Sequence, residues 1–321
     1  MKKLVVLDGE TLGREINIDL LKEFGEVVYY DLTNEEDVKD RIKDANIVIT
    51  NKVVLNEDNL CEAKNLEIIC ESATGYNNID VEYAKKNNIA VTNVAKYSTQ
   101  AVIQLTFAMA LNLYNKIGYF DDYVKSGAYS LSGKFTNVEK GFEEICGKIW
   151  GIIGLGNIGS GVASVAEAFG AHVVYYSTSG KNNNDKYERV ELDELLAKSD
   201  IVSIHSPLNA DTRGLIDYEK LKLMKKNAIL INVGRGSIVV EKDLARAIDE
   251  DLILGAGVDV FDVEPIAQDN PLLNVKNKEK LILTPHIAWA SIEARKRLLL
   301  MMIDNIRAFY RGEEKNRVDK K

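Results

Sequence analysis

A glycine-rich segment, Gly154-Leu155-Gly156-Asn157-Ile158-Gly159, constrains the fold of this chain more than any other feature of the sequence. It follows the apolar run 149–153 and precedes the small-residue segment 160–170, a pattern that predicts a strand, a tight turn and a helix. Another apolar run at 171–176 predicts the next strand. In such a unit the first glycine permits the turn, the second lets backbone N–H groups approach a pyrophosphate, and the third allows the helix to pack closely on the strand. The segment therefore predicts a dinucleotide site.

The composition excludes several classes of protein. A chain of 321 residues, 46% of them hydrophobic, is long and apolar enough for two folded domains. Its net charge of -8 argues against a nucleic-acid surface, which requires clustered positive charge. The three cysteines, Cys61, Cys70 and Cys146, lack Cys-x-x-Cys spacing. We therefore expect buried, reduced thiols in a cytoplasmic protein, with no disulfide framework and no metal site.

The sequence predicts no membrane segment. The opening apolar run 4–7 follows two lysines, is too short for a signal peptide, and is expected to form a strand. The uncharged segment 149–166 is nearly long enough to span a bilayer. Its glycines, together with Asn157, Ser160 and Ser164, fit a buried nucleotide-binding segment better.

Short apolar runs alternate with charged segments along both halves of the chain, a pattern that predicts parallel α/β units. The runs in the first half are 3–7, 27–30, 47–50, 66–70 and 89–91. The runs in the second half are 149–153, 172–176, 201–204, 228–233, 254–258 and 281–283. Six strands in the second half suit a doubly wound nucleotide-binding sheet.

Three other segments complete the expected organisation. Residues 99–119 are almost uncharged and predict a buried helix that joins the two domains. Residues 291–311 have an amphipathic pattern and predict a last helix, which we expect to return to the first domain. Residues 315–321 are highly charged and are expected to fray.

The chain has only three histidines, so the search for a proton donor is short. His172 begins a strand and is expected at the surface. His205 follows the strand 201–204, so it either lines the cofactor site or has a structural role. His286 follows the strand 281–283 and is the best candidate for an acid and base, because imidazole titrates near neutral pH.

Two charged residues follow neighbouring strands and give His286 possible partners. Glu264 lies past the strand 254–258, where a carboxylate beside an imidazole favours its charged form and fixes its orientation. A helix cap or a solvated loop is the alternative for Glu264. Arg235 lies between Gly234 and Gly236, and a guanidinium grips a carboxylate through two parallel hydrogen bonds. A surface arginine is the alternative for Arg235.

Four motifs together resemble those of the D-isomer-specific 2-hydroxyacid dehydrogenases, and they extend over essentially the whole chain. They are the glycine segment, Asn232-Val233-Gly234-Arg235-Gly236, Gly257-Val258-Asp259-Val260-Phe261-Asp262-Val263-Glu264-Pro265 and Thr284-Pro285-His286-Ile287-Ala288-Trp289-Ala290-Ser291. Residues 97–99, 106–108, 285–289 and Gln104 are most similar to the glycerate dehydrogenase, or hydroxypyruvate reductase, branch of that family. Leu105 departs from the branch, whose members usually have histidine there.

The resemblance implies an α/β protein with two doubly wound parallel-sheet domains. One is a discontinuous, flavodoxin-like substrate or lid domain, made of residues 1–98 plus 290–321. The other is a Rossmann domain, residues 99–289, that binds NAD(H) or NADP(H). Because substrate and cofactor groups come from different domains, closure of the domains is expected to assemble the site and exclude water.

The resemblance also implies roles for single residues. Arg235 would bind the substrate carboxylate and carbonyl, helped by backbone N–H groups around Thr74, Gly75 and Tyr76, with Trp289 nearby. His286 would donate a proton to the carbonyl oxygen as hydride passes between the nicotinamide and C2, and Glu264 would keep His286 charged. The implied cofactor contacts are Gly154, Gly156, Asn157, Ile158, Gly159, Ser177, His205, Ser206, Pro207, Thr212, Val233, Gly234 and Asp259.

One position leaves the cofactor preference open. NAD-specific relatives have an aspartate at the end of the second strand, where this chain has Ser177. Without that carboxylate a 2′-phosphate is not repelled, and Ser177, Thr178 and Lys181 are candidates to bind it. No arginine directly follows the strand, so NADP preference is only a hypothesis.

The sequence is also compatible with two other functions, and the resemblance implies an oligomer. A D-lactate-type or other 2-keto acid reductase is the nearest competing enzyme, because its substrates share the 2-keto acid core. A non-catalytic protein that senses NAD is the competing function outside enzymes. The resemblance further implies a homodimer formed through residues 119–147, where Tyr119, Phe120, Tyr123, Tyr129, Phe135 and Phe142 are dense for a loop.

Overall fold

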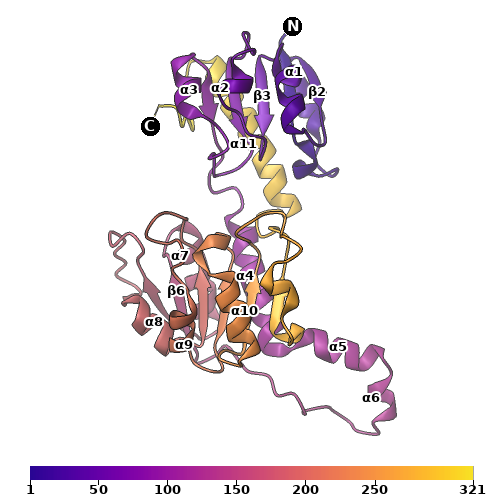
Figure 1. Cartoon of the computed structure of the whole chain (residues 1–321), viewed down its shortest axis with the longest axis vertical. Coiled ribbons are helices and arrows are strands. Elements are labelled where there is room, and N and C mark those ends of the chain that lie inside the picture. The colour runs from indigo at the N-terminus through magenta and orange to yellow at the C-terminus, as the bar shows by residue number, and fades with distance from the viewer. Residues whose placement is uncertain (321) are drawn as a thin grey trace. The chain divides into compact units, whose positions relative to one another are not determined.

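A computed structural model of the chain describes residues 1–320 and contains two compact units (Figure 1). Unit 1 comprises Met1–Ser98 and Ala290–Lys321, and unit 2 comprises Thr99–Trp289. Lys321 lies outside the described residues. Each unit has its own parallel sheet, so the expected fold class is confirmed.

The sheet of unit 1 has five parallel strands in the order β2-β1-β3-β4-β5. This is the flavodoxin-like strand order. The strands are β1 (Lys3–Val6), β2 (Glu26–Tyr29), β3 (Ile47–Thr50), β4 (Ile68–Glu71) and β5 (Ala90–Thr92). The central strands are short and rich in valine and isoleucine, and they are buried except at Lys3, as expected for a parallel sheet covered on both faces.

Helices and 3-10 turns connect the strands of unit 1. The 3-10 turns are η1 (Gly9–Leu12), η2 (Ile18–Phe24) and η3 (Glu35–Asp37). The helices are α1 (Val38–Ile42), α2 (Glu57–Leu60), α3 (Val81–Lys86) and α11 (Ile292–Tyr310). Ser291 caps α11 by accepting a hydrogen bond from the Ala294 N–H at 3.2 Å. Helix α11 belongs to unit 1.

The charged tail is not frayed over its described part, so that expectation is wrong for residues 315–320. The Val318 N–H donates to Val91 O at 2.9 Å, and the Asp319 carboxylate accepts from the Val91 N–H at 3.0 Å. Arg317 pairs with Asp319 at 2.5 Å, and Asp319 is only 4% exposed. The tail docks on β5 because its charges neutralise one another locally.

The sheet of unit 2 has seven parallel strands in the order β12-β11-β10-β9-β6-β7-β8. They are β6 (Ile149–Ile153), β7 (His172–Tyr176), β8 (Glu188–Arg189), β9 (Ile201–Ile204), β10 (Ile229–Asn232), β11 (Gly255–Val258) and β12 (Leu281–Leu283). The short strand β8 was not predicted, because an exposed Glu-Arg pair carries no apolar signal. The six strands β8-β7-β6-β9-β10-β11 lie in the doubly wound order, and β12 adds a seventh strand beside β11.

Helices flank this sheet, and two apolar clusters pack on its opposite faces because neighbouring residues of each strand point to opposite sides. The helices are α4 (Thr99–Asn115), α5 (Ile117–Lys125), α6 (Ala128–Leu131), α7 (Asn157–Ala168), α8 (Leu192–Lys198), α9 (Tyr218–Leu223) and α10 (Glu241–Asp249). The 3-10 turns are η4 (Gly236–Ile238), η5 (Pro271–Asn274) and η6 (Lys278–Lys280). Helix α7 begins at the glycine segment itself, three residues earlier than predicted.

The helix predicted at 99–119 ends earlier than expected. It stops at Asn115, because Lys116 adopts a left-handed backbone conformation with φ of 51°. The chain then continues as α5 and α6, which extend away from the rest of unit 2 in Figure 1. The aromatic-rich segment is therefore an arm that contains two short helices rather than a loop.

Two further expectations concern cysteines and membranes. Cys70 is buried as expected, but Cys61 is half-buried and Cys146 is exposed, so the prediction of buried thiols holds only for Cys70. All three thiols are free. Across residues 1–320, the length and apolarity of every helix fall short of what a membrane crossing requires.

Candidate active site

The candidate active site lies at the carboxyl ends of β10, β11 and β12, three neighbouring parallel strands of unit 2. Backbone hydrogen bonds continue past the strands and link their ends. The Asp259 N–H donates to Asn232 O at 3.0 Å, and the His286 N–H donates to Asp259 O at 2.8 Å. The structure thus brings the residues after these strands to one edge of the sheet, where parallel α/β sheets bind ligands.

His286 and Glu264 form a hydrogen-bonded pair at this edge. His286 Nδ1 lies 2.7 Å from Glu264 Oε2, and the two side chains are 27% and 32% exposed. The carboxylate can only accept, so Nδ1 carries the proton and Nε2 is left for a ligand. Glu264 Oε1 also accepts from the Phe261 N–H at 2.9 Å, which fixes the carboxylate. The pair is therefore oriented as an acid–base unit requires.

Buried Asp259 holds the His286 loop in place. Its carboxylate accepts from the backbone N–H groups of Ile287 and Ala288, both at 2.8 Å, and from Thr284 Oγ1 at 2.6 Å. Burial raises the pKa of Asp259, while these donors lower it. His286 has a positive φ of 53°, a strained conformation for a residue other than glycine. The bonds to Asp259 stabilise that conformation.

Arg235 is exposed and lies in the turn after β10, which ends at Asn232. Its Nη1 donates to Gly234 O at 2.8 Å, and within residues 1–320 it forms no ion pair. Buried Asn232 shapes the segment: Nδ2 donates to Arg235 O at 3.0 Å, and Oδ1 accepts from the Gly234 N–H at 3.1 Å. The guanidinium is thus presented to solvent from a fixed turn.

The glycine turn has the geometry of a phosphate-binding loop. Gly154 has a φ of 94°, and a Cβ on it would lie 2.9 Å from Ser206 N. A Cβ on Gly159 would lie 2.3 Å from Gly154 O, so only glycine lets α7 pack this closely on the turn. A Cβ on Gly156 would meet no atom within 4 Å, so this position borders open space. Asn157 is exposed and donates to Thr99 Oγ1 at 2.6 Å.

The segment after β9 lies against this turn and carries two unsatisfied polar atoms. His205 Nδ1 and Ser206 Oγ are buried and have no hydrogen-bond partner among the described residues. His205 Nε2 lies 3.0 Å from Ser203 Oγ, which also accepts from Trp150 Nε1. Burial lowers the pKa of His205 to about 3, so the ring is neutral at working pH. Unsatisfied polar atoms beside an open glycine turn fit a dinucleotide at this place.

Other predicted cofactor residues have different surroundings. Thr212 is fully buried, and its hydroxyl donates to Pro207 O at 2.8 Å, so it shapes the loop that follows Ser206. Val233 is buried and Ile158 half-buried at the same edge. Ser177 is 4% exposed, and its Oγ accepts from the Asn182 N–H at 3.2 Å.

An arginine that the sequence did not reveal is hydrogen-bonded to the loop after β7. Arg189, on β8, donates from Nη1 to Gly180 O at 3.0 Å and to Asn183 Oδ1 at 3.3 Å. Asn182 Nδ2 donates to Leu155 O in the glycine turn at 2.8 Å. The Arg189 guanidinium thus contacts the loop that begins at Ser177, although Arg189 itself lies on the strand after that loop.

The predicted substrate residues Thr74, Gly75 and Tyr76 belong to unit 1, in the loop after β4. Thr74 is exposed, and Gly75 and Tyr76 are half-buried. Thr74 Oγ1 donates to Val94 O at 3.0 Å, and Asn93 Nδ2 donates to Thr74 O at 2.7 Å. The loop is therefore held from the segment after β5. Trp289 is half-buried at the end of unit 2.

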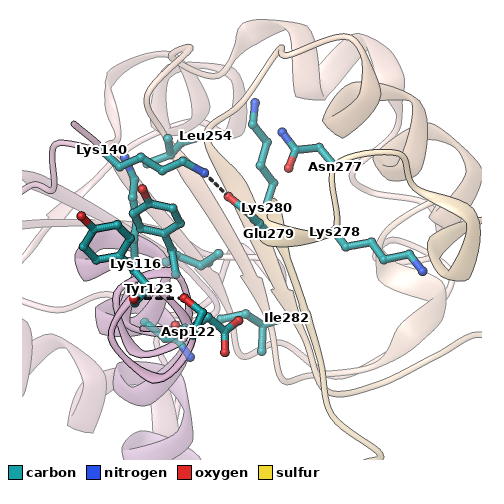
Figure 2. A pocket seen from close by; sticks show the side chains of 15 residues that line it. Lys116, Asp122, Tyr123, Lys140, Leu254, Asn277, Lys278, Glu279, Lys280 and Ile282 are labelled. Carbon is teal, nitrogen blue, oxygen red and sulfur yellow. Dashed lines mark hydrogen bonds and ion pairs between the residues drawn. The ribbon is translucent and has the colours of Figure 1, made fainter. Parts of the chain in front are cut away.

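A large pocket of unit 2 lies away from this edge. It has a volume of about 730 Å³ and is formed by the arm and the segments before β11 and β12 (Figure 2). Figure 2 shows Lys140 paired with Glu279 across it, and Tyr123 and Asp122 on the arm side. None of the predicted site residues lines this pocket.

Comparisons with known proteins agree with this geometry. The model of the D-isomer specific 2-hydroxyacid dehydrogenase family, NAD binding domain, matches residues 107–288. The chain is 38% identical to a hydroxypyruvate reductase of Blautia hydrogenotrophica, across 99% of this chain and 100% of the relative. A solved acyclic imino acid reductase in complex with NADPH and D-Arg is 31% identical with a TM-score of 0.83, covering 98% of this chain and 99% of that chain. The D-lactate dehydrogenase of Aquifex aeolicus, complexed with NAD and lactic acid, is 28% identical with a TM-score of 0.83 and 99% coverage of both.

The fold and the site define an oxidoreductase that uses a nicotinamide cofactor and acts on CH–OH groups. The chain belongs to the D-isomer-specific 2-hydroxyacid dehydrogenase family. The resemblance drawn from its sequence motifs is therefore confirmed.

Proposed function

We propose that this protein reduces small 2-keto acids, with hydroxypyruvate preferred over glyoxylate and pyruvate, and that it also catalyses the reverse oxidation. The observation that carries the proposal is the 2.7 Å contact between His286 and Glu264, on the sheet edge that also presents exposed Arg235. The similarity to a hydroxypyruvate reductase along the whole chain supports the choice of substrate.

The proposed chemistry uses His286 as the acid. When bound, NADH or NADPH would supply the hydride that reduces C2 of the substrate. His286 Nε2 donates a proton to the carbonyl oxygen, so the ketone becomes a hydroxyl group and the imidazolium becomes neutral imidazole. Glu264, hydrogen-bonded to Nδ1, stabilises the imidazolium before the transfer. In the reverse direction neutral His286 accepts the hydroxyl proton.

Arg235 is proposed to bind the substrate. Its guanidinium matches a carboxylate through two parallel hydrogen bonds, and its position on the same sheet edge as His286 supports this role. The backbone N–H groups of Thr74, Gly75 and Tyr76 are proposed as further donors to the same carboxylate, and Trp289 as a wall for the rest of the substrate.

A substrate panel tests the proposal. Hydroxypyruvate, glyoxylate, pyruvate and phenylpyruvate are each mixed with the protein and NADH, and the loss of NADH absorbance is followed. We expect hydroxypyruvate to give the highest kcat/KM. Fastest turnover of pyruvate supports the D-lactate-type alternative, which the likeness to the Aquifex aeolicus enzyme favours. Binding of NADH without reduction of any 2-keto acid contradicts the proposal and leaves a protein that senses NAD.

We also propose that the protein accepts NADPH as well as NADH. No carboxylate directly follows β7, Ser177 stands at that place, and Arg189 of β8 donates to Gly180 O in the loop that contains Thr178 and Lys181. A guanidinium beside hydroxyl groups fits a 2′-phosphate. Ser177→Asp is expected to lower kcat/KM with NADPH by about tenfold or more, because the new carboxylate repels the phosphate. Arg189→Gln is expected to lower kcat/KM with NADPH and to leave kcat/KM with NADH unchanged. An equal loss of kcat/KM with both cofactors contradicts the assignment.

The arm is proposed to form a homodimer. Helices α5 and α6 contain no buried residue, and the arm exposes many large apolar side chains. They are Ile117, Val124, Tyr129, Leu131, Phe135, Val138 and Phe142, of which Phe135 is 95% exposed. Apolar side chains gathered on one projecting segment favour an interface. The neighbouring pocket in Figure 2 supplies a concave surface beside them.

Light scattering after size exclusion tests the dimer. We expect a dimer mass for the wild type and a monomer for Leu131→Asp combined with Phe135→Asp. The matched control is Leu32→Asp, because Leu32 is 66% exposed and belongs to unit 1 rather than to the arm. A monomeric wild type at high concentration contradicts the proposal. We further propose a cytoplasmic location, which the three free thiols support.

A further inference from the structure

Unit 1 contains a buried carboxyl group that the proposed chemistry does not use. Glu71 ends β4 and is 0% exposed. Its Oε2 accepts from Asn78 Nδ2 at 3.1 Å, whereas its Oε1 is buried with no hydrogen-bond partner in residues 1–320. Buried polar atoms in folded proteins are nearly always satisfied, so this group calls for an explanation.

Asn78 connects Glu71 to a neighbouring loop. Asn78 Nδ2 also donates to Val53 O at 3.1 Å, and Asn78 O accepts from the Leu55 N–H at 2.8 Å. These bonds fasten the far end of the segment 72–79 to the loop after β3. The near end is fastened by Ser72, whose N–H and Oγ donate to Thr50 O at 2.7 and 3.0 Å. Glu71 thus lies at the base of a loop that is fixed at both ends.

This loop carries Thr74, Gly75 and Tyr76, the residues proposed to bind the substrate carboxylate. Their backbone N–H groups can converge on one carboxylate only when the loop keeps a single conformation. The side-chain hydrogen bond of Glu71 goes to Asn78 and not to these three residues, so its effect on substrate binding passes through Asn78 and the chain.

We propose that Glu71 is a positioning residue that, as a neutral carboxylic acid, holds loop 72–79 in the conformation that binds the substrate. The proposal rests on the proposed function, because it assigns the loop to the substrate. Protonated Glu71 keeps one oxygen as an acceptor for Asn78 without placing a charge in the interior. Ionised Glu71 places an uncompensated charge beside the loop, and the loop is expected to rearrange to bring solvent to it.

The electrostatics of the surroundings agree with a neutral carboxyl group. Burial raises the pKa of Glu71 to about 9, the hydrogen bond from Asn78 lowers it, the Asp8 carboxylate raises it, and the Lys52 ammonium lowers it. The adjacent Cys70 thiol stays neutral, because burial raises its pKa to about 12. Glu71 is therefore protonated at pH 7 and loses its proton as the pH passes 9.

The sign of the pH effect follows from linkage. In the unfolded chain Glu71 ionises near its ordinary pKa of 4.5, so above that pH the folded state holds a proton that the unfolded state has released. The folded state is therefore favoured less and less as the pH rises from 4.5 to 9. The loop conformation that binds the substrate is depopulated only when Glu71 of the folded protein loses its proton, near pH 9.

The first experiment measures KM and kcat for hydroxypyruvate from pH 7 to 9.5. A single ionisation near pH 9 leaves about a quarter of the molecules competent at pH 9.5, so KM of the wild type is expected to rise about fourfold. Glu71→Gln cannot ionise and is expected to show no such rise. Both proteins are expected to share one kcat profile, since His286 is intact in both. A KM rise of equal size in Glu71→Gln overturns the proposal.

Two more variants separate positioning from folding. Glu71→Val removes the acceptor for Asn78 and is expected to raise KM at every pH with little change in kcat. Asp319→Asn is the matched control, because Asp319 is a second buried carboxylate of unit 1 that binds the Val91 N–H and Arg317. It is expected to keep the wild-type pH profile of KM. A fall in kcat without a change in KM for Glu71→Val also overturns the proposal.

Hydrogen exchange distinguishes this proposal from the proposed function. Amide exchange of residues 72–79 is measured at pH 7 and 9.5 without ligands and corrected for the intrinsic pH dependence. The wild type is expected to lose protection in this segment at pH 9.5, and Glu71→Gln is expected to keep it. If no 2-keto acid is reduced but exchange follows this pattern, the role of Glu71 in holding the loop stands and the substrate assignment fails. Identical exchange in the two proteins overturns the role of Glu71.

Discussion

The two units use the same kind of parallel sheet, yet the ends of their strands carry different chemistry. In unit 1 the order reverses between β1 and β3, the place where flavodoxin-like sheets bind a ligand. In this protein a side chain of unit 1 takes the position of a ligand there, because the Asp8 carboxylate accepts hydrogen bonds from the N–H groups of Asn51, Lys52 and Val53. In unit 2 the order reverses between β6 and β9, where Gly156 borders open space and His205 and Ser206 keep unsatisfied atoms.

The comparison shows that the strand order sets where a ligand can bind. The residues that follow the strands determine whether a ligand binds there. Unit 1 satisfies its backbone donors with its own carboxylate, so the residues there shape loops. Unit 2 leaves donors and acceptors unsatisfied at the turn and presents Arg235 and His286 after β10 and β12, on the two sides of β11. We therefore expect substitutions at the edge of unit 2 to affect catalysis and cofactor binding, and those at the edge of unit 1 to affect stability and KM.

The largest effect is expected for His286→Ala. Loss of the proton donor is expected to lower kcat for hydroxypyruvate by about 10³-fold, within the range of general acid catalysis. The affinity for NADH, measured by fluorescence titration, is expected to stay unchanged. His172→Ala is the matched control, because His172 is an exposed histidine of the same unit. Equal losses in the two variants contradict the role of His286.

Arg235→Lys is expected to have the next largest effect. A lysine keeps the charge but loses the planar fork, so kcat/KM is expected to fall by about 100-fold, or about 2.7 kcal/mol. Steady-state kinetics with hydroxypyruvate measure it. Arg213→Lys, on the surface of the same unit, is the control. If Arg235→Lys keeps the wild-type kcat/KM, the guanidinium does not bind the substrate as proposed.

Asp8→Asn tests the other side of the comparison. The amide replaces one acceptor by a donor that faces backbone N–H groups, so the free energy of unfolding is expected to fall by about 2 kcal/mol. Denaturant unfolding followed by circular dichroism measures the loss. NADH affinity is expected to match the wild type. A large loss of NADH affinity with unchanged stability would place the Asp8 cluster in the cofactor site and break the comparison.

The smallest effect is expected for Gly156→Ala. The added Cβ meets no atom within 4 Å, so the fold is expected to keep its stability. The methyl group occupies the space offered to the pyrophosphate, so the Kd for NADH is expected to rise about tenfold. Gly159→Ala is the contrasting variant, because its Cβ would lie 2.3 Å from Gly154 O and should also destabilise the fold. If Gly156→Ala leaves the Kd unchanged, the open space is not the pyrophosphate site.

Much of the fold could be predicted because apolar runs report buried strands directly. The bounds of β3, β6, β7, β9 and β12 match the predicted runs. The prediction missed β8, whose Glu188 and Arg189 are exposed, and it extended α4 past Lys116, whose left-handed conformation has no apolar signal. It also took the tail for a frayed end, because local charge density does not reveal that Arg317 and Asp319 neutralise each other.

The candidate site was predictable where a residue type carries its own chemistry. His286, Glu264 and Arg235 stand out by charge and by their place after a strand, and the structure brings them to one edge. The side-chain partners that hold them were not predictable, since Asp259 bonds to the His286 loop through hydrogen bonds between residues that are distant in sequence. The role of Glu71 was not predictable from the sequence, because only its burial and the missing hydrogen-bond partner of Oε1 make it unusual.

The most direct test of the account is a side-by-side measurement of kcat and KM for hydroxypyruvate reduction by the wild type, His286→Ala and Glu71→Val. The account predicts that the wild type turns over, that His286→Ala loses kcat and keeps KM, and that Glu71→Val raises KM and keeps kcat. It is contradicted if the wild type binds NADH but reduces no 2-keto acid, or if His286→Ala keeps the wild-type kcat.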